Sequence, residues 1–242
     1  MTRAELLQIA KPILFNTEMV KAILEGRKTV TRRVCKDGNE CTVPDMSFFD
    51  ASKRTYAVHN YTDAEHTDKL SIAERKCPIC PGDILYVRET YVAWHLPFGE
   101  VQYCYKATDQ NGNKRPCSPE YDCDWEVRPW RPSIHMPKGA ARIFLKVKDV
   151  RVELLQDITE EQTEAEGFQF TPPCLSTVSE DSYCDLDGPC TNKVKYCDMS
   201  AGELFGKVLW NSTIKKEDID TYGWDANPWV WVIEFERIEP EQ

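Results

Sequence analysis

The segment that most restricts the fold of this chain reads Gly26-Arg27-Lys28-Thr29-Val30-Thr31-Arg32-Arg33. It follows a stretch in which apolar residues recur every four positions, the spacing of one helix face. Glycine commonly ends a helix because it adopts a left-handed backbone conformation without steric cost. We therefore expect a helix, capped by Asn16 or Thr17, that ends at Gly26, and a strand from Lys28 to Cys35.

The residue types in this segment point to chemistry. A fully extended backbone would direct Lys28 and Thr31 to opposite faces, but a bend after the glycine can bring both to one site. A Thr hydroxyl becomes a nucleophile only when a base lies within hydrogen-bond reach. Lys28 can be that base if burial and the like charges of Arg32 and Arg33 disfavour its ammonium form. The residues alone also allow a basic strand that faces solvent.

Strands dominate the remaining sequence. Turn signals and apolar patterns predict strands at Pro12–Phe15, at Ile84 to about Trp94 after the Pro81-Gly82-Asp83 turn, at Val101–Ala107 as its hairpin partner, at Arg142–Leu155 and at Trp229–Ile238. Capping boxes predict helices from Thr159 to Gly167 and from Ser200 to about Trp210. Residues 36–81, 109–137 and 168–198 read as insertions, and in the first of these only Thr55–Tyr61 suggests a strand. Because no βαβα alternation is present, we expect one α+β domain over residues 11–239, built on a small mixed β-barrel.

Composition restricts the class of ligand. The chain has 242 residues and a formal net charge of −10, which argues against broad electrostatic binding to double-stranded DNA or to anionic membranes. Residues 1–10 contain no apolar run of signal-peptide length, and the sequence has no apolar stretch of about 18 residues that would span a membrane. We therefore expect a cytoplasmic protein whose ligand is small or single-stranded.

The chain contains 11 cysteines, and without a secretory signal they are better read as free thiols or metal ligands than as disulfides. One insertion is poor in large apolar residues and carries the candidate zinc ligands Cys174, Cys184, Cys190 and Cys197. The short spacing of Cys77-Pro78-Ile79-Cys80 also suits zinc, with Cys35 and Cys41 as possible additional ligands. We expect any zinc to be structural. A set of reduced thiols is the alternative.

The segment around Lys28 resembles the signature of the ASCH domain, a PUA-like barrel, whose motif is Gly, any residue, Lys, two residues, Glu, any residue, Arg. Gly26, Lys28 and Arg33 match this motif, and Thr31 stands where the general motif has Glu. A Thr at this position is similar to the small ASCH amidohydrolases that deacetylate N-acetylcytidine. The resemblance implies a catalytic set of Lys28, Thr31 and Glu166, with no cofactor needed for catalysis.

Other segments extend the resemblance over most of the chain. The family's Gly-Asp turn and strand resemble Pro81–Val87, its Glu-bearing helix resembles Ile158–Glu166, and its closing strand resembles Val232–Phe235. Longer phage and prophage ASCH proteins resemble this chain at Leu14–Met19, at Trp130–Pro137 and at Trp224–Trp229. The resemblance implies a PUA-like fold and a modified nucleoside or single-stranded RNA as partner.

Several further residues are candidates for ligand binding: Arg32, Arg33, Arg88, Glu89, Trp130, Arg131, His135 and Trp224. Aromatic rings and guanidinium groups are the surfaces on which single-stranded bases stack. Glu89 alternates with Leu85 and Val87 on an apolar face and therefore needs a partner, for which we expect Arg33 or Arg131. The functional hypotheses are an amidohydrolase of an N-acylated pyrimidine nucleoside, an RNA-binding module without turnover, and an RNA-cleaving ASCH protein.

Overall fold

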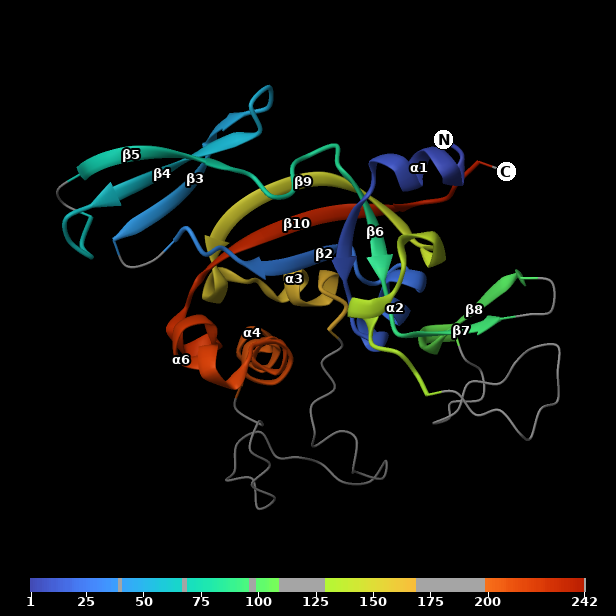
Figure 1. Cartoon of the computed structure of the whole chain (residues 1–242). Helices are drawn as coiled ribbons and strands as arrows, with labels where there is room; N and C mark the ends of the chain where they lie inside the picture. The colour runs from blue at the N-terminus through green and yellow to red at the C-terminus, as the bar shows by residue number, and fades with distance from the viewer. Residues whose placement is uncertain (39–40, 67–68, 96–98, 109–128, 169–198, 242) are drawn as a thin grey trace, which may run out of the picture. The chain divides into compact units, whose positions relative to one another are not determined.

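The computed structural model describes residues 1–38, 41–66, 69–95, 99–108, 129–168 and 199–241. They form a mixed α+β protein with three sheets and short helices (Figure 1). The chain divides into two compact, discontinuous units. Unit 1 comprises Met1–Thr31, Cys77–Val150 and Ile233–Gln242, and unit 2 comprises Arg32–Lys76 and Arg151–Val232.

Each unit contains both helices and strands. Unit 1 contains α1 (Arg3–Ile9), β1 (Lys11–Leu14), α2 (Thr17–Leu24), β6 (Ile84–Arg88), β7 (Tyr91–His95) and β8 (Val101–Tyr105). Unit 2 contains β3 (Thr42–Asp50), β4 (Thr55–Tyr61), β5 (Lys69–Lys76), α3 (Glu160–Ala165), α4 (Ala201–Leu204), a π-helix (Phe205–Trp210), α5 (Asn211–Thr213) and α6 (Ile219–Tyr222). The residue ranges of β2 (Val30–Val34), β9 (Phe144–Leu154) and β10 (Trp229–Ile238) begin in one unit and end in the other.

The largest sheet has the strand order β1-β6-β9-β10-β2. Within unit 1, β1 pairs parallel to β6, with Lys11 opposite Leu85, and β6 pairs antiparallel to β9, with Leu85 opposite Leu145. This order leaves β1 and β2 as edge strands, and no sheet closes into a barrel in the part of the chain that the structure describes. The α+β class is therefore as predicted, whereas the closed barrel is not seen.

An apolar core holds unit 1 together. Its buried members come from α1 and the residue after it, from β6 and β7, and from the segment that leads into the first residue of β9: Leu6, Ala10, Tyr86, Tyr91, Met136, Ala140, Ala141 and Phe144. The 3₁₀ turn Ser133–His135 lies in the segment that was predicted to be a loop, and a second 3₁₀ turn, Lys138–Ala140, follows directly after that segment. Residues 109–128, the larger part of that loop, lie outside the described residues.

The expectation for residues 36–81 was wrong in part. The predicted strand is present as β4, but β3 and β5 flank it in an antiparallel sheet of order β3-β4-β5. β5 is exposed along almost its whole length, so it has no apolar period that reveals it. β3 has a register shift between Asp45 and Asp50 and contains Pro44, a residue that ordinarily argues against a strand.

The long strand predicted from Ile84 to about Trp94 is two strands. β6 ends at Arg88 and belongs to the five-stranded sheet, and β7 begins at Tyr91 and pairs with β8 as a separate hairpin. Apolar residues continue across the break, so the sequence pattern does not show where one strand ends.

The predicted helix boundaries are confirmed by their caps. The Asn16 side chain accepts a hydrogen bond from the Met19 amide at 2.8 Å, and Thr159 and Ser200 each form the expected capping box. The helical segment after Ser200 differs in kind, because a π-helix follows its first α-helical turn and helical structure continues to Thr213. None of the described helices combines the length and the apolar character that crossing a membrane requires.

Candidate functional site

Glycine shapes the backbone between α2 and the basic segment. Gly26 has φ +77° and follows the helix, where its amide donates to the Ile23 carbonyl at 3.1 Å. The Arg27 amide donates to the Ala22 carbonyl at 2.9 Å, which completes a Schellman motif. The Lys28 amide donates to the same carbonyl at 3.0 Å. The bend expected from the sequence is therefore present, and it leads directly into Lys28.

Lys28 and Thr31 are both buried, and both belong to unit 1. The Lys28 side chain donates from Nζ to the Val30 carbonyl at 2.7 Å and lies 5.6 Å from the centre of the Phe15 ring. The exposed fraction is 2% for Lys28 and 0% for Thr31. The Thr31 hydroxyl has no hydrogen-bond partner among the described residues. A buried hydroxyl without a partner is unusual, because burial removes the hydrogen bonds that water would make.

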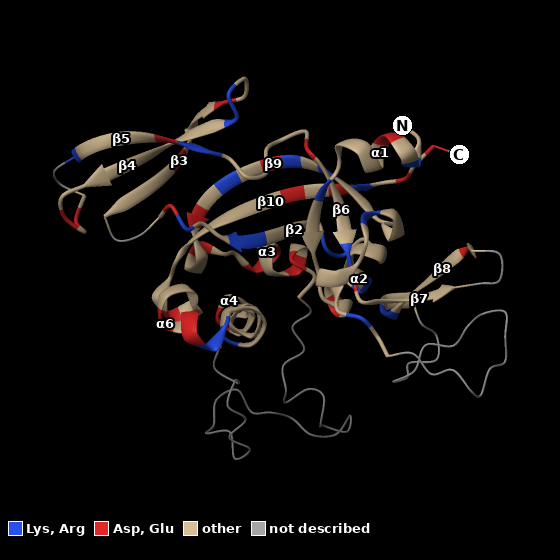
Figure 2. Ribbon diagram, viewed as in Figure 1, with Lys and Arg blue, Asp and Glu red and all other residues tan. Residues whose placement is uncertain are grey.

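Arg32, the first residue of unit 2, is held by three side chains of that unit. Its side chain is fully buried and donates to Glu153 Oε1 at 2.6 Å, to Gln162 Oε1 at 2.5 Å and to Glu166 Oε1 at 3.3 Å. Arg32 Nε has no partner among the residues that the structure describes. The guanidinium thus joins β9 to both ends of α3. In Figure 2, basic residues mark β2 and acidic residues mark α3.

Glu166 is the C-cap residue of α3, and its side chain is only 3% exposed. A carboxylate at this end of a helix is disfavoured by the helix dipole, so the Arg32 guanidinium provides a compensating charge. Arg33 is half-buried and donates from Nη1 to the Arg32 carbonyl at 3.0 Å. Burial lowers the pKa of Arg33, and the charge of Glu166 acts in the opposite direction.

The predicted catalytic residues therefore occupy two units. Lys28 and Thr31 belong to unit 1, and Glu166 belongs to unit 2 together with Arg32 and Arg33. Each of the three side chains is buried. Their convergence on one substrate stays a prediction.

Sequence reasoning missed the side chains that fix Arg32. Gln162 was identified only as a capping residue, yet its Oε1 accepts both from the Thr159 amide and from Arg32. Glu153 lies in β9 among alternating residues and gives no separate signal. The sequence offers one indication of these contacts, which is that neighbouring predicted elements carry residues of opposite charge.

Glu89 has the ion pair that its buried position requires, but the expected partner was wrong. Glu89 is 1% exposed and accepts from Arg142 Nε at 2.8 Å and from Arg142 Nη2 at 2.9 Å, not from Arg33 or Arg131. The Arg142 guanidinium stacks on the Tyr105 ring at 4.0 Å, and burial raises the pKa of Tyr105 to about 12. This bidentate pair belongs to unit 1 and ties the start of β7 to the segment before β9.

The loop from Trp130 to Pro137 is anchored through its backbone. Arg88 donates from Nε to the Met136 carbonyl at 3.1 Å and also donates to the Ile134 carbonyl, while the Tyr91 hydroxyl donates to the His135 carbonyl at 2.9 Å. The side chains of Arg131 and His135 are exposed, and Trp130 is half-buried. Arg88 thus supports this loop, and the two exposed side chains remain candidates for ligand contact.

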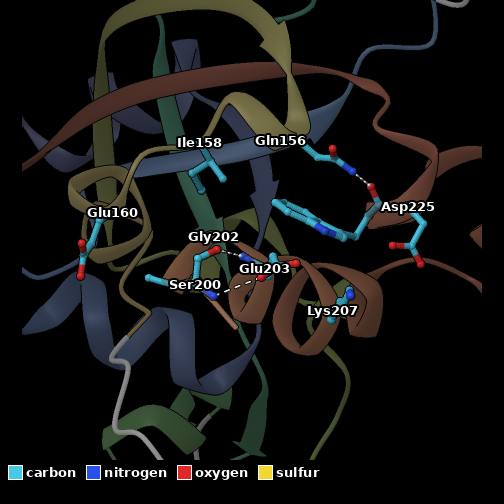
Figure 3. A pocket seen from close by; sticks show the side chains of 10 residues that line it. Gln156, Ile158, Glu160, Ser200, Gly202, Glu203, Lys207 and Asp225 are labelled. Atoms are coloured by element: carbon cyan, nitrogen blue, oxygen red, sulfur yellow. Dashed lines mark hydrogen bonds between the residues drawn. The ribbon is translucent and has the colours of Figure 1, made fainter. Parts of the chain in front are cut away.

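A pocket lies entirely within unit 2 (Figure 3). Its volume is about 440 Å³, and it includes the predicted ligand-binding residue Trp224. The residues that line it are Gln156, Ile158, Glu160, Ser200, Ala201, Gly202, Glu203, Lys207, Trp224 and Asp225. Apart from Trp224, sequence reasoning proposed none of them as a binding residue.

The zinc prediction is only partly covered by the described residues. Cys174, Cys184, Cys190 and Cys197 lie outside them. Within them Cys35, Cys41, Cys77 and Cys80 are free thiols, and no group of three or more His, Cys, Asp or Glu side chains is arranged to hold a metal. Burial raises the pKa of the Cys35 thiol. The cysteine-rich insertion stays a prediction of a structural zinc site.

Comparison with known proteins identifies no relative: the chain matches no protein-family model, no curated protein and no solved structure.

Proposed function

We propose that this protein is an ASCH-type, PUA-like hydrolase that removes an acyl group from the exocyclic nitrogen of a pyrimidine nucleoside. In this proposal Thr31 attacks the amide carbonyl, Lys28 takes the hydroxyl proton, and Glu166 accepts this proton from Lys28 and returns it to the leaving amine as the C–N bond breaks. The acyl-threonine is then hydrolysed by water, which gives a carboxylate and the free amino nucleoside.

The proposal rests on the burial of Lys28 and Thr31 and on the lack of a hydrogen-bond partner for the Thr31 hydroxyl among the described residues. A buried hydroxyl without a partner among the described residues, three positions from a buried amine, is costly to maintain for stability alone. Buried polar groups that break the ordinary rules of packing are concentrated at functional sites. Hydrolysis of an amide needs a nucleophile, a base and a proton donor, and Thr31, Lys28 and Glu166 supply these three groups.

Glu166 suits the third role because it is buried and held in place. Arg32 binds one of its oxygens at 3.3 Å, and Arg32 is itself fixed by Glu153 and Gln162. Preorganised charged groups stabilise a transition state without reorganising during the reaction. The proposal requires Lys28, Thr31 and Glu166 to act on the same substrate.

A second candidate function is the binding of single-stranded RNA without turnover. The observation that favours it is the anchored loop of unit 1 that presents Arg131 and His135 to solvent beside the half-buried Trp130. A guanidinium and an aromatic ring suit the stacking of unpaired bases. The formal net charge of −10 disfavours extended RNA contacts, which is why we place this function second.

Incubation with N-acetylcytidine tests the first function. We expect an absorbance change as cytidine forms, and we expect Lys28→Ala to slow it about 100-fold or more, because a general base typically contributes that much. The matched control is Lys21→Ala, since Lys21 is an exposed lysine of α2 that pairs only locally with Glu18. Equal rates for the wild type and Lys28→Ala would refute the catalytic role. No turnover together with tight, salt-sensitive oligonucleotide binding would favour the RNA-binding function.

A further inference from the structure

The unit 2 pocket has a rigid aromatic wall. The Trp224 amide donates to Asn211 Oδ1 at 2.8 Å, and the Trp224 carbonyl accepts from Gln156 Nε2 at 2.9 Å. The indole ring packs so closely on Gly206 that a Cβ built there would lie 1.9 Å from Trp224 Cε3. The position of the ring is therefore fixed before any ligand arrives.

The indole N–H of Trp224 has no hydrogen-bond acceptor among the described residues. Trp224 is 6% exposed and lines the pocket. The indole nitrogen is not one of the fully buried unsatisfied atoms among the described residues, so water can reach it and accept from it. A ligand acceptor in the pocket would satisfy it.

Charged groups of both signs surround this donor. Lys207, Glu160 and Asp225 line the pocket, and none of them has an ion-pair partner within the described part of the chain. Figure 3 shows Glu160 and Asp225 on opposite sides of the pocket, with Ser200, Gly202 and Glu203 between them. Lys207 belongs to the π-helix, a rare form that often marks functional sites.

The pattern of donors and acceptors restricts the ligand. Ionised carboxylates only accept hydrogen bonds, so the exposed Glu160 and Asp225 can replace water with donors at two separated ends of a ligand. Lys207 and the indole N–H need acceptors between those ends. Three carboxylates (Glu160, Glu203 and Asp225) against one ammonium disfavour a phosphate group. A volume of about 440 Å³ suits a small organic molecule.

We propose that this pocket binds a ribonucleoside whose base carries an exocyclic amino group. Asp225 accepts from the amino group, Lys207 and the Trp224 indole donate to the ring acceptors, and Glu160 accepts from the ribose hydroxyls. Carboxylates recognise the amino group of cytosine and the hydroxyls of ribose in this way in other proteins. The choice of a nucleoside over other amino compounds rests on the proposed function, and the pocket would bind the amino nucleoside that the hydrolysis produces.

Calorimetric titration with cytidine, uridine and 2′-deoxycytidine tests this proposal. Uridine has a carbonyl in place of the amino group, so we expect it to bind about tenfold more weakly than cytidine, or worse. Deoxycytidine lacks one ribose hydroxyl and should also bind more weakly. Asp225→Asn should reduce the preference for cytidine over uridine, and Glu160→Gln should reduce the preference for the ribonucleoside over the deoxynucleoside.

Controls separate this pocket from the proposed catalytic site. Asp220→Asn removes an exposed carboxylate of α6 outside the pocket and should leave all three affinities unchanged. The expected effects of Asp225→Asn and Glu160→Gln do not require turnover, because neither residue belongs to the proposed catalytic set, so the result stands whether or not the protein is a hydrolase. Cytidine binding that is indifferent to Asp225→Asn and Glu160→Gln, or absent at millimolar concentration, would overturn the proposal. Binding of a free amino acid in place of cytidine would do the same.

Discussion

At the scale of single residues, the most demanding feature is the buried Arg32 guanidinium. It is fully buried and forms ion pairs with Glu153 and Glu166. Removing the guanidinium would leave these carboxylates without a counter-charge. We expect Arg32→Met to lower the free energy of unfolding by about 3–5 kcal/mol, because Glu153 and Glu166 would lose a buried counter-charge. Urea denaturation of the two proteins measures this difference.

Arg151 provides the matched control for Arg32. It also donates to Glu153, at 3.1 Å, but its side chain is 31% exposed. Water can replace such a contact, so Arg151→Met should cost about 1 kcal/mol or less. Equal losses in the free energy of unfolding for the two substitutions would show that burial does not explain the contribution of the Arg32 ion pairs.

The site was predictable where the signal was local. Gly26, Lys28 and Thr31 stand within six positions of one another, and the capping box at Thr159 fixes where α3 ends and therefore where Glu166 lies. The partners of Arg32 and Glu89 were not predictable, because 121 residues separate Arg32 from Glu153 and 53 separate Glu89 from Arg142. A single sequence says which residues need a partner, and the folded chain decides which partner each one has.

At the scale of elements, the π-helix is fixed by its contact with Trp224. Gly206→Ala would place a methyl group inside the indole ring, so either the ring or the helix must move. We expect a loss of about 1–3 kcal/mol in the free energy of unfolding, as in other overpacked cores. Thermal or urea unfolding checks the result.

Gly202→Ala is the corresponding control for Gly206→Ala. A Cβ at Gly202 would meet its nearest neighbour, Ile158 Cγ2, at 3.4 Å, which is close to ordinary contact. Alanine also favours a helix over glycine by about 1 kcal/mol, so this substitution should be neutral or slightly stabilising. Comparable destabilisation by both substitutions would show that the close packing of Trp224 is not the cause.

The helices whose first residues were predicted correctly are those that begin at a capping residue. Asn16, Thr159 and Ser200 each form the expected cap, because capping depends on residues three positions apart. The sheet formed by β3, β4 and β5 was underestimated for the opposite reason. β5 is held by pairing with the preceding strand β4 rather than by a buried apolar face, and backbone pairing leaves no periodic pattern of apolar residues in the sequence.

At the scale of the whole molecule, the account depends on Thr31 being the nucleophile of a site to which Lys28 and Glu166 also belong. Thr31 ends the first of the three segments of unit 1, and the Arg32 that holds Glu166 is the first residue of unit 2. The formal net charge of −10 agrees with a small neutral substrate better than with a polyanion.

The most direct test is mass spectrometry of the peptide that contains Thr31, after the wild-type protein is mixed with N-acetylcytidine and quenched in acid during the first turnovers. We predict an acetyl group on this peptide that is absent after the same treatment of Thr31→Val, which lacks the nucleophile, and of Glu166→Gln, which cannot return a proton to the leaving amine. Release of cytidine by Thr31→Val at the wild-type rate, with no acetylated Thr31 in any variant, would contradict the account.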